Sequence, residues 1–187
     1  MANNYNKKLS ETQVRIGEVR FSYANVFEPR VDQNGNEKYS CSILIPKDNT
    51  AAVKMVEEAI NAAKQNGKTS KWGGKIPANC KSPLRDGDID REDDENYAGC
   101  WFINASARAQ NKPAVKVLDG GILADALDNE DFYSGCYGVA VLNFFPYDAS
   151  GNKGVGAGLN IVMKTRDGEK FGGGVNVNEA LSGLYDD

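Results

Sequence analysis

Apolar residues alternate with polar residues in several stretches of this chain, and a period of two is the pattern of a β-strand with one buried face. The alternation is clearest in residues 38–46, where the apolar positions are Tyr39, Cys41, Ile43 and Ile45. Residues 155–163 show the same pattern, and residues 135–147 are apolar on both faces, which predicts a central strand. We therefore expect a mainly β fold.

A shift of phase interrupts the first predicted strand. Val14 and Ile16 share one face, but after Gly17 the apolar positions move to Val19 and Phe21. One inserted residue is what a β-bulge produces, and a bulged strand is strongly curved. Curved strands with few helices fit a small closed β-barrel of the OB type better than a parallel α/β sheet.

One segment has the helical period instead. Its apolar residues recur every three or four positions as far as about Gln65, with Asp48 or Thr50 as the N-cap and Gly67 as the stop. Residues 67–98 are then expected to form a long loop that is first basic and then acidic. The expected fold is an OB-fold of about five main strands, with the helix inserted after the second or third strand.

Glycines mark two further features. Asn34-Gly35 favours the positive φ of a hairpin turn. Gly154, Gly156 and Gly158 lie at alternate positions within a predicted strand, so they do not form the strand-to-helix loop that binds phosphate. Small residues on one face of a strand are expected to permit curvature or a close approach by another group.

The length of 187 residues fits one domain. Residues 1–12 are polar and are expected to form a flexible N-terminal arm, residues 13–174 the OB-fold domain, and residues 175–187 an acidic C-terminal tail. No apolar run approaches the roughly 20 residues of a membrane-spanning helix, and the N-terminus has no apolar stretch typical of a secretory signal. We therefore expect no membrane partner.

Histidine is absent, which removes the Ser-His-Asp and Cys-His catalytic sets. It also removes the side chain most often used for proton transfer near neutral pH. The four cysteines are widely spaced and include no C-x-x-C pair, which argues against a zinc site. We expect a binding protein rather than an enzyme, with no metal and no other cofactor.

The net charge of −4 conceals a strong asymmetry. Residues 1–85 hold 14 Lys and Arg against 8 Asp and Glu, whereas residues 86–187 hold 8 against 18. The basic first half also carries aromatic residues, and single-stranded nucleic acid needs this mixture: cations for phosphates and flat rings for unpaired bases. The candidate DNA-binding residues are Arg15, Arg20, Tyr23, Lys38, Tyr39, Lys68, Lys71, Trp72, Lys75, Lys81 and Arg85. The alternative is that Trp72 covers the mouth of the barrel and the lysines are merely solvated.

The acidic run from Asp86 to Glu95 is a second candidate site. Its spacing resembles a calcium loop, but the EF-hand positions for Gly and Glu are Arg91 and Tyr97, so that match fails. Paired carboxylates can hold Mg²⁺ in a nuclease, which leaves a metal-dependent nuclease as an alternative function. A third hypothesis is an interaction module that binds no DNA, and the simplest interpretation of the run is a solvated acidic loop.

Several segments together resemble a family of bacteriophage single-stranded-DNA-binding proteins. The matching stretches are residues 20–29, 38–46, 71–77, 83–88, 132–138, 152–154 and 166–168. The resemblance implies an OB-fold protein that coats single-stranded DNA during phage replication or recombination, in the cytoplasm of the infected bacterial host. It also suggests that Lys71–Lys75 and Arg85 contact the DNA.

The acidic end of the chain is a candidate docking site for phage replication or recombination proteins. It combines apolar anchors with negative charge in Leu184, Tyr185, Asp186 and Asp187. A disordered terminus explains the same composition equally well. A homodimer stays open at this point, as do the size of the DNA site and its cooperativity.

Overall fold

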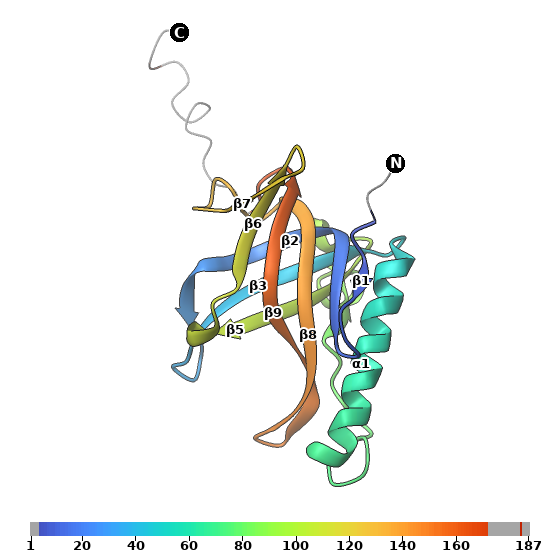
Figure 1. Cartoon of the computed structure of the whole chain (residues 1–187). Coiled ribbons are helices and arrows are strands. Elements are labelled where there is room, and N and C mark those ends of the chain that lie inside the picture. The colour runs from blue at the N-terminus through green and yellow to red at the C-terminus, as the bar shows by residue number, and fades with distance from the viewer. Residues whose placement is uncertain (1–3, 172–183, 185–187) are drawn as a thin grey trace.

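The computed structural model of the chain describes residues 4–171 and residue 184. Strongly curved strands wrap into a barrel, and one long helix lies against it (Figure 1). In chain order the elements are β1 (Lys7–Lys8), β2 (Gln13–Val31), β3 (Glu37–Pro46), α1 (Thr50–Ser70), β4 (Leu84–Asp86), α2 (Gly87–Asp90), η1 (Glu95–Tyr97), β5 (Cys100–Arg108), η2 (Ala109–Asn111), β6 (Ala114–Asp119), β7 (Ile122–Asp125), β8 (Tyr137–Ala149) and β9 (Asn152–Arg166).

Five strands close the barrel in the order β5-β3-β2-β8-β9, and β9 returns to β5. Neighbouring strands are antiparallel except at this closure, where the parallel pairing of β5 with β9 consists of Ser106 and Gly158. Short strands extend the sheet: β1 beside β2, β4 beside β5, and the β6–β7 hairpin beside β9. The predicted OB-type barrel, with its main helix after the third strand, is confirmed.

The bulge that gives β2 its curvature lies where the sequence predicts it. The pairing of β2 with β8 shifts register between Ile16 and Val19, and Glu18 between them has a φ of 57°. The shift keeps the apolar side chains of both segments inside the barrel, since Ile16, Val19 and Phe21 are all fully buried. The turn at Asn34-Gly35 is also confirmed, because Gly35 has a φ of 79°.

Helix α1 packs its apolar face into the barrel core, but its ends differ from the prediction. The N-cap is Asn49, whose side-chain oxygen accepts a hydrogen bond from the Ala52 N–H at 3.4 Å. The helix also continues past Gly67, which is buried within it. A Cβ at Gly67 would lie 2.5 Å from Pro146 and 2.7 Å from the Trp72 ring, so this glycine makes room for packing rather than ending the helix. Neither α1 nor another described helix has the length and apolar character to cross a membrane.

A second, smaller apolar cluster covers the outer face of β3. It consists of Leu44, Tyr97 and Phe102, and the Tyr97 hydroxyl donates a hydrogen bond to Ser42 Oγ at 3.0 Å. The strand predicted at residues 38–46 is therefore buried on both faces toward its end, rather than on one face. The predicted long loop is in part ordered by this contact, because η1 carries Tyr97 onto the barrel.

The N-terminal segment differs from the flexible arm expected for residues 1–12. Lys7 and Lys8 form β1 and pair with β2. The Arg15 side chain donates a hydrogen bond to the Tyr5 carbonyl at 2.6 Å, and the Gly17 N–H donates to Asn6 Oδ1 at 2.8 Å. These polar residues are thus held by hydrogen bonds to β2. The sequence gives no sign of this, because the segment carries no alternating apolar pattern.

The contact of Trp72 with α1 and β8 predicts a large effect on stability. The indole lies over Gly67 and its Nε1–H donates to the Tyr147 carbonyl at 3.1 Å. Replacing Trp72 by Ala removes a buried ring and should lower the free energy of unfolding by about 3–5 kcal/mol, measured by urea denaturation. Lys71→Ala, at the exposed neighbouring position, should change it by less than about 0.5 kcal/mol. Equal effects of the two variants would contradict the packing role of Trp72.

Candidate nucleic-acid interface

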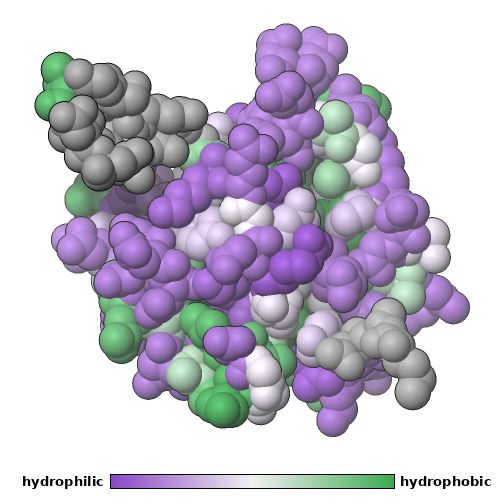
Figure 2. Space-filling model, turned by 90° about the horizontal axis from the view of Figure 1, so that it is seen from above, coloured by the Kyte–Doolittle hydropathy of each residue, from purple (hydrophilic) through white to green (hydrophobic). Residues whose placement is uncertain are grey.

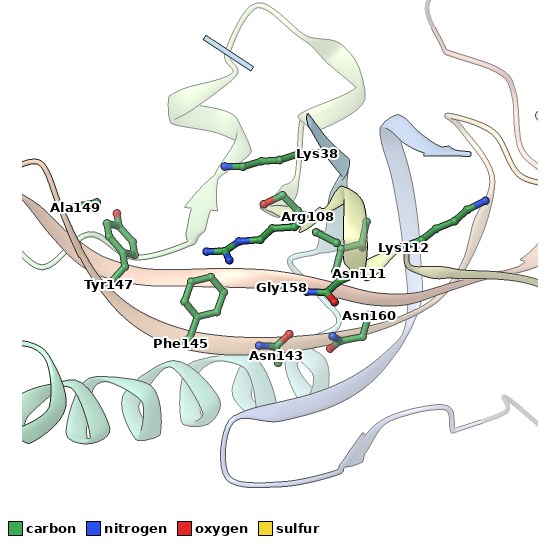
Figure 3. Close-up of a pocket in the computed structure, with 13 residues that line it drawn as sticks. Lys38, Arg108, Asn111, Lys112, Asn143, Phe145, Tyr147, Ala149, Gly158 and Asn160 are labelled. Carbon is green, nitrogen blue, oxygen red and sulfur yellow. The ribbon is translucent and has the colours of Figure 1, made fainter. Parts of the chain in front are cut away.

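A groove of about 710 Å³ lies beside the residue pair that joins β5 to β9. We call it the β5–β9 groove, and its lining residues are Lys38, Ser106, Ala107, Arg108, Asn111, Lys112, Asn143, Phe145, Tyr147, Ala149, Gly158, Leu159 and Asn160. Lys38 and Arg108 extend from one wall, and Phe145 and Tyr147 rise from the β8 side toward the same space (Figure 3). The groove therefore combines cations, amides and aromatic rings.

The charges of the β5–β9 groove are all positive. Lys38, Arg108 and Lys112 line it, and its lining includes no Asp or Glu. Lys38 lies 3.4 Å from Asp32, whereas Arg108 and Lys112 form no ion pair with a carboxylate in the described part of the chain. Unpaired cations gathered in a concave surface attract an anion and raise its local concentration.

Two of these cations are also direct cross-strand neighbours. Lys38 of β3 pairs in register with Arg108 of β5. Like charges directly opposite each other in a sheet are destabilising. An anion bound between them would remove this repulsion, so the pairing favours a ligand with negative charge.

A stripe of glycines makes room for the side chains on the floor of the groove. Three residues of β8 lie directly opposite a glycine of β9. Asn143 pairs with Gly158, Phe145 pairs with Gly156, and Tyr147 pairs with Gly154. A Cβ at Gly156 would lie 2.8 Å from the Phe145 ring, so the ring occupies the space that a side chain would fill. The expected role of these glycines, a close approach by another group, is confirmed. The Phe145 ring remains 42% exposed, which leaves it open to a ligand.

A second hollow of about 680 Å³ continues the groove past Tyr147, which lines both. Its lining includes the polar side chains of Lys81, Ser82, Arg85, Asp90 and Asn104. Lys81 Nζ donates to Asn152 Oδ1 at 2.8 Å, and Arg85 forms an ion pair with Asp90 at 3.2 Å. We call this hollow the groove extension, and it adds one cation without a carboxylate partner among the described residues, Lys81, and the Arg85–Asp90 ion pair.

The structure brings together only some of the predicted binding residues. Lys38 lies in the β5–β9 groove, and Lys81 and Arg85 lie in its extension. Lys71 and Lys75 are exposed in the loop after α1, and Trp72 of the same loop contacts Tyr147 of the groove. Lys68 is exposed in the last turn of that helix.

The structure does not favour the predicted base-stacking role of Trp72 or the predicted binding role of Tyr39. Trp72 is 8% exposed and Tyr39 is 7% exposed, so neither ring presents a face to a base. Trp72 fills the space above Gly67, and Tyr39 points into the barrel core from β3. The alternative, in which Trp72 covers the barrel, matches this burial.

Three other predicted residues lie away from the groove. The Arg20 side chain donates to the Gly135 carbonyl at 2.9 Å and lies 4.1 Å from the Phe171 ring, so it holds neighbouring segments together. Arg15 is engaged with the Tyr5 carbonyl. Tyr23 is exposed, but the pocket it lines is formed by the acidic residues that follow α2.

Sequence reasoning missed the groove residues of the second half of the chain. They are Arg108, Lys112, Asn143, Phe145 and Tyr147. The consecutive aromatic pair Phe144-Phe145 carried a usable signal, because adjacent strand residues face opposite sides and one ring must point outward. Phe144 is indeed buried, while Phe145 is open. The acidic mean charge of this half concealed the two cations that it contributes to the groove.

The acidic run from Asp86 to Glu95 has structural partners instead of a metal site. Asp86 and Asp94 cap α2 and η1, and Lys47 lies 2.7 Å from both Asp86 and Asp88. The Lys47 ammonium lowers the pKa of Asp88, with a further contribution from the Gly99 N–H. Among the residues that the structure describes, no group of three or more Asp, Glu or Cys side chains could hold a metal ion.

The buried thiols are equally unsuited to nucleophilic chemistry. Burial raises the pKa of Cys136 to about 11, and it raises the pKa of Cys41 further still. Both groups therefore stay protonated near neutral pH, whereas a nucleophilic cysteine needs the thiolate. These two residues belong to the core cluster of the barrel.

The barrel and its cationic, ring-bearing groove define an OB-fold protein with a surface for an anionic polymer. The family described as "Enterobacter phage Enc34, ssDNA-binding protein" matches residues 12–186, and the chain belongs to it. The predicted family is confirmed, and membership also confirms a binding protein rather than an enzyme. The nuclease alternative is therefore not supported.

Individual relatives agree with this assignment. The structure is similar to that of the single-stranded DNA-binding protein of bacteriophage Enc34 in complex with ssDNA, with a TM-score of 0.74 and 27% identity over 90% of this chain and 98% of that one. A C-terminally truncated form of the Enc34 protein gives a TM-score of 0.73 and 28% identity over 88% and 95% of the two chains. Protein p50 of Acyrthosiphon pisum secondary endosymbiont phage 1 is 35% identical over 92% of this chain and 94% of its own length.

The repulsion between Lys38 and Arg108 is testable without any ligand. Replacing Arg108 by Gln should raise the free energy of unfolding by about 0.3 kcal/mol at low ionic strength, measured by urea denaturation. The gain should vanish in 1 M salt, where the screening length falls to about 3 Å. Lys54→Gln on α1, away from the groove, is the control and should show no such gain. An Arg108→Gln variant that is less stable at low salt would contradict the repulsion.

Proposed function

We propose that the protein binds single-stranded DNA with little sequence preference through the β5–β9 groove. It acts in phage DNA replication and recombination, in the cytoplasm of the infected bacterial host. The observation that carries this proposal is the acid-free groove with Lys38, Arg108 and Lys112 on a protein whose net charge is −4. Membership of a family of ssDNA-binding proteins supports the same ligand.

The phosphates lie along the wall that carries the cations. Arg108 and Lys112 have no carboxylate partner among the described residues, so DNA need not compete with an ion pair for them. Each phosphate neutralised in this way releases counterions, which makes the affinity depend on salt. Lys81 extends the cationic path into the groove extension, where Arg85 is paired with Asp90.

The bases stack on the rings of the groove floor. Phe145 and Tyr147 are two residues apart on β8, which places them roughly 7 Å apart along the strand. This spacing is about twice the separation of stacked bases in a duplex, so each ring receives a base from an unstacked, extended strand. Stacking is tolerant of sequence because every base has a flat face.

Two predicted partnerships remain predictions. Leu184 is 79% exposed, as an anchor for a partner protein must be, but Tyr185, Asp186 and Asp187 lie outside the described residues. The acidic tail is still a candidate docking site for replication or recombination proteins. The homodimer likewise stays open.

The salt dependence of binding tests the role of the unpaired cations. Arg108→Ala and Lys112→Ala should each weaken the binding of labelled oligo-dT and reduce the slope of log K against log salt by about 0.7. Fluorescence anisotropy titrations at several salt concentrations measure both quantities. Lys54→Ala removes one positive charge from α1 and should leave the slope unchanged. The same slope change in all three variants would point to net charge rather than to this groove.

Stacking predicts a loss of affinity that salt does not alter. Phe145→Ala should weaken oligo-dT binding by about 1–3 kcal/mol with an unchanged salt slope, and Phe145→Trp should retain binding. Gly156→Ala is the matched test of position, because its Cβ would displace the Phe145 ring without removing it. Wild-type affinity in both Phe145→Ala and Gly156→Ala would exclude stacking at this position.

A further inference from the structure

The β6–β7 hairpin exposes large apolar side chains that the DNA-binding groove does not use. Ile122 is 71% exposed, Leu123 is 60% exposed, and Leu127 just after the hairpin is 82% exposed. All four residues of β7 are exposed, and the hairpin lies at one end of the barrel (Figure 1). Viewed from that end, apolar patches interrupt an otherwise hydrophilic surface (Figure 2). Large exposed apolar side chains within one short segment are candidates for an interaction site.

Among the residues that the structure describes, the backbone of β7 is also open along one edge. It is the last strand of the sheet, and β6 is its strand neighbour. The Gly120-Gly121 turn makes Asp119 and Ile122 a hydrogen-bonded pair, and the Ala126 N–H donates to the Val115 carbonyl, so the even-numbered residues face β6. The N–H and C=O groups of Leu123 and Asp125 therefore point away from the sheet.

This edge lacks three of the features that normally prevent strand pairing, although the strand is only four residues long and ends in the charged Asp125. Edge strands are usually protected by lysine, proline or a bulge. The sequence of β7 is Ile-Leu-Ala-Asp, and its pairing with β6 runs in continuous register. The turn holds Gly120 and Gly121 at φ values of 55° and 81°, so the hairpin has a defined shape before any partner arrives.

The charge of the residues around β7 indicates which kind of partner would bind at this edge. Residues 119–131 contain five carboxylates and no Lys or Arg, and only Asp125 among them forms an ion pair in the described part of the chain, with Lys116 of β6. DNA would be repelled there, and a second copy would bring the same negative charge to a symmetric contact. A segment with positive charge is attracted instead, since complementary potentials guide association between proteins.

We propose that β7 is a docking edge for a cationic, extended segment of another protein. The segment adds a strand beside Leu123 and Asp125, places apolar side chains against Ile122 and Leu127, and sets Lys or Arg against the surrounding carboxylates. None of the residues 119–127 lines the β5–β9 groove. The docking edge therefore goes beyond the proposed DNA binding and leaves the groove free for DNA.

Selection of random 12-residue displayed peptides on the full-length protein tests the proposal. The selected peptides should be rich in Lys and Arg alternating with apolar residues. Their affinity should fall at least tenfold with Leu123→Pro, which removes an N–H that points away from the sheet, and with Leu123→Lys. Ile89→Lys changes an exposed apolar residue outside the hairpin and should leave the affinity unchanged. Hydrogen exchange should show new protection of the Leu123 and Asp125 amides.

Oligo-dT affinity serves as the check on folding and separates the two proposals. It should be unchanged in all three variants, because these residues lie outside the groove. Selected peptides without positive charge, or peptides indifferent to both Leu123 variants, would overturn the docking edge. A concentration-dependent dimer that Leu123→Lys abolishes would also overturn it, because the occupant would then be a second copy.

Discussion

The barrel closes through one parallel residue pair, Ser106 of β5 with Gly158 of β9, and the proposed binding surface depends on this closure. It brings the end of β5 beside the middle of the β8–β9 hairpin, two regions that are some 50 residues apart in the chain. Arg108 and Phe145 face the same groove only because of this contact. Since glycine has no side chain, Gly158 leaves room at this closure for the Asn143 side chain, which lines the groove.

Around that closure, the residues that we propose for DNA binding lower the local stability. Lys38 and Arg108 face each other without a carboxylate between them on the groove wall, and the Phe145 ring stays exposed to water. Gly156 makes fewer packing contacts than a larger strand residue would, and it loses more conformational entropy on folding. The deep core, with α1 and its Gly67 contact to Trp72, provides the compensating stability.

Local features of the sequence predicted much of the fold and less of the site. The β2 bulge and the Asn34-Gly35 turn depend on residues close together in the sequence, so they were predictable. Trp72 was not, because a tryptophan beside two glycines in a basic loop has the same local sequence whether it stacks on a base or on Gly67. Arg108 and Lys112 were missed because the mean charge of a segment does not show which side chains meet after the barrel closes.

The most direct test of this account is to map the DNA-contacting surface by amide chemical shifts on titration with oligo-dT. The largest shifts should cluster along residues 104–112 of β5 and η2 and residues 143–147 of β8, with smaller changes on β9 around Gly158. Shifts concentrated around Arg20 or along the acidic run from Asp86 to Glu95, with the groove unperturbed, would contradict it.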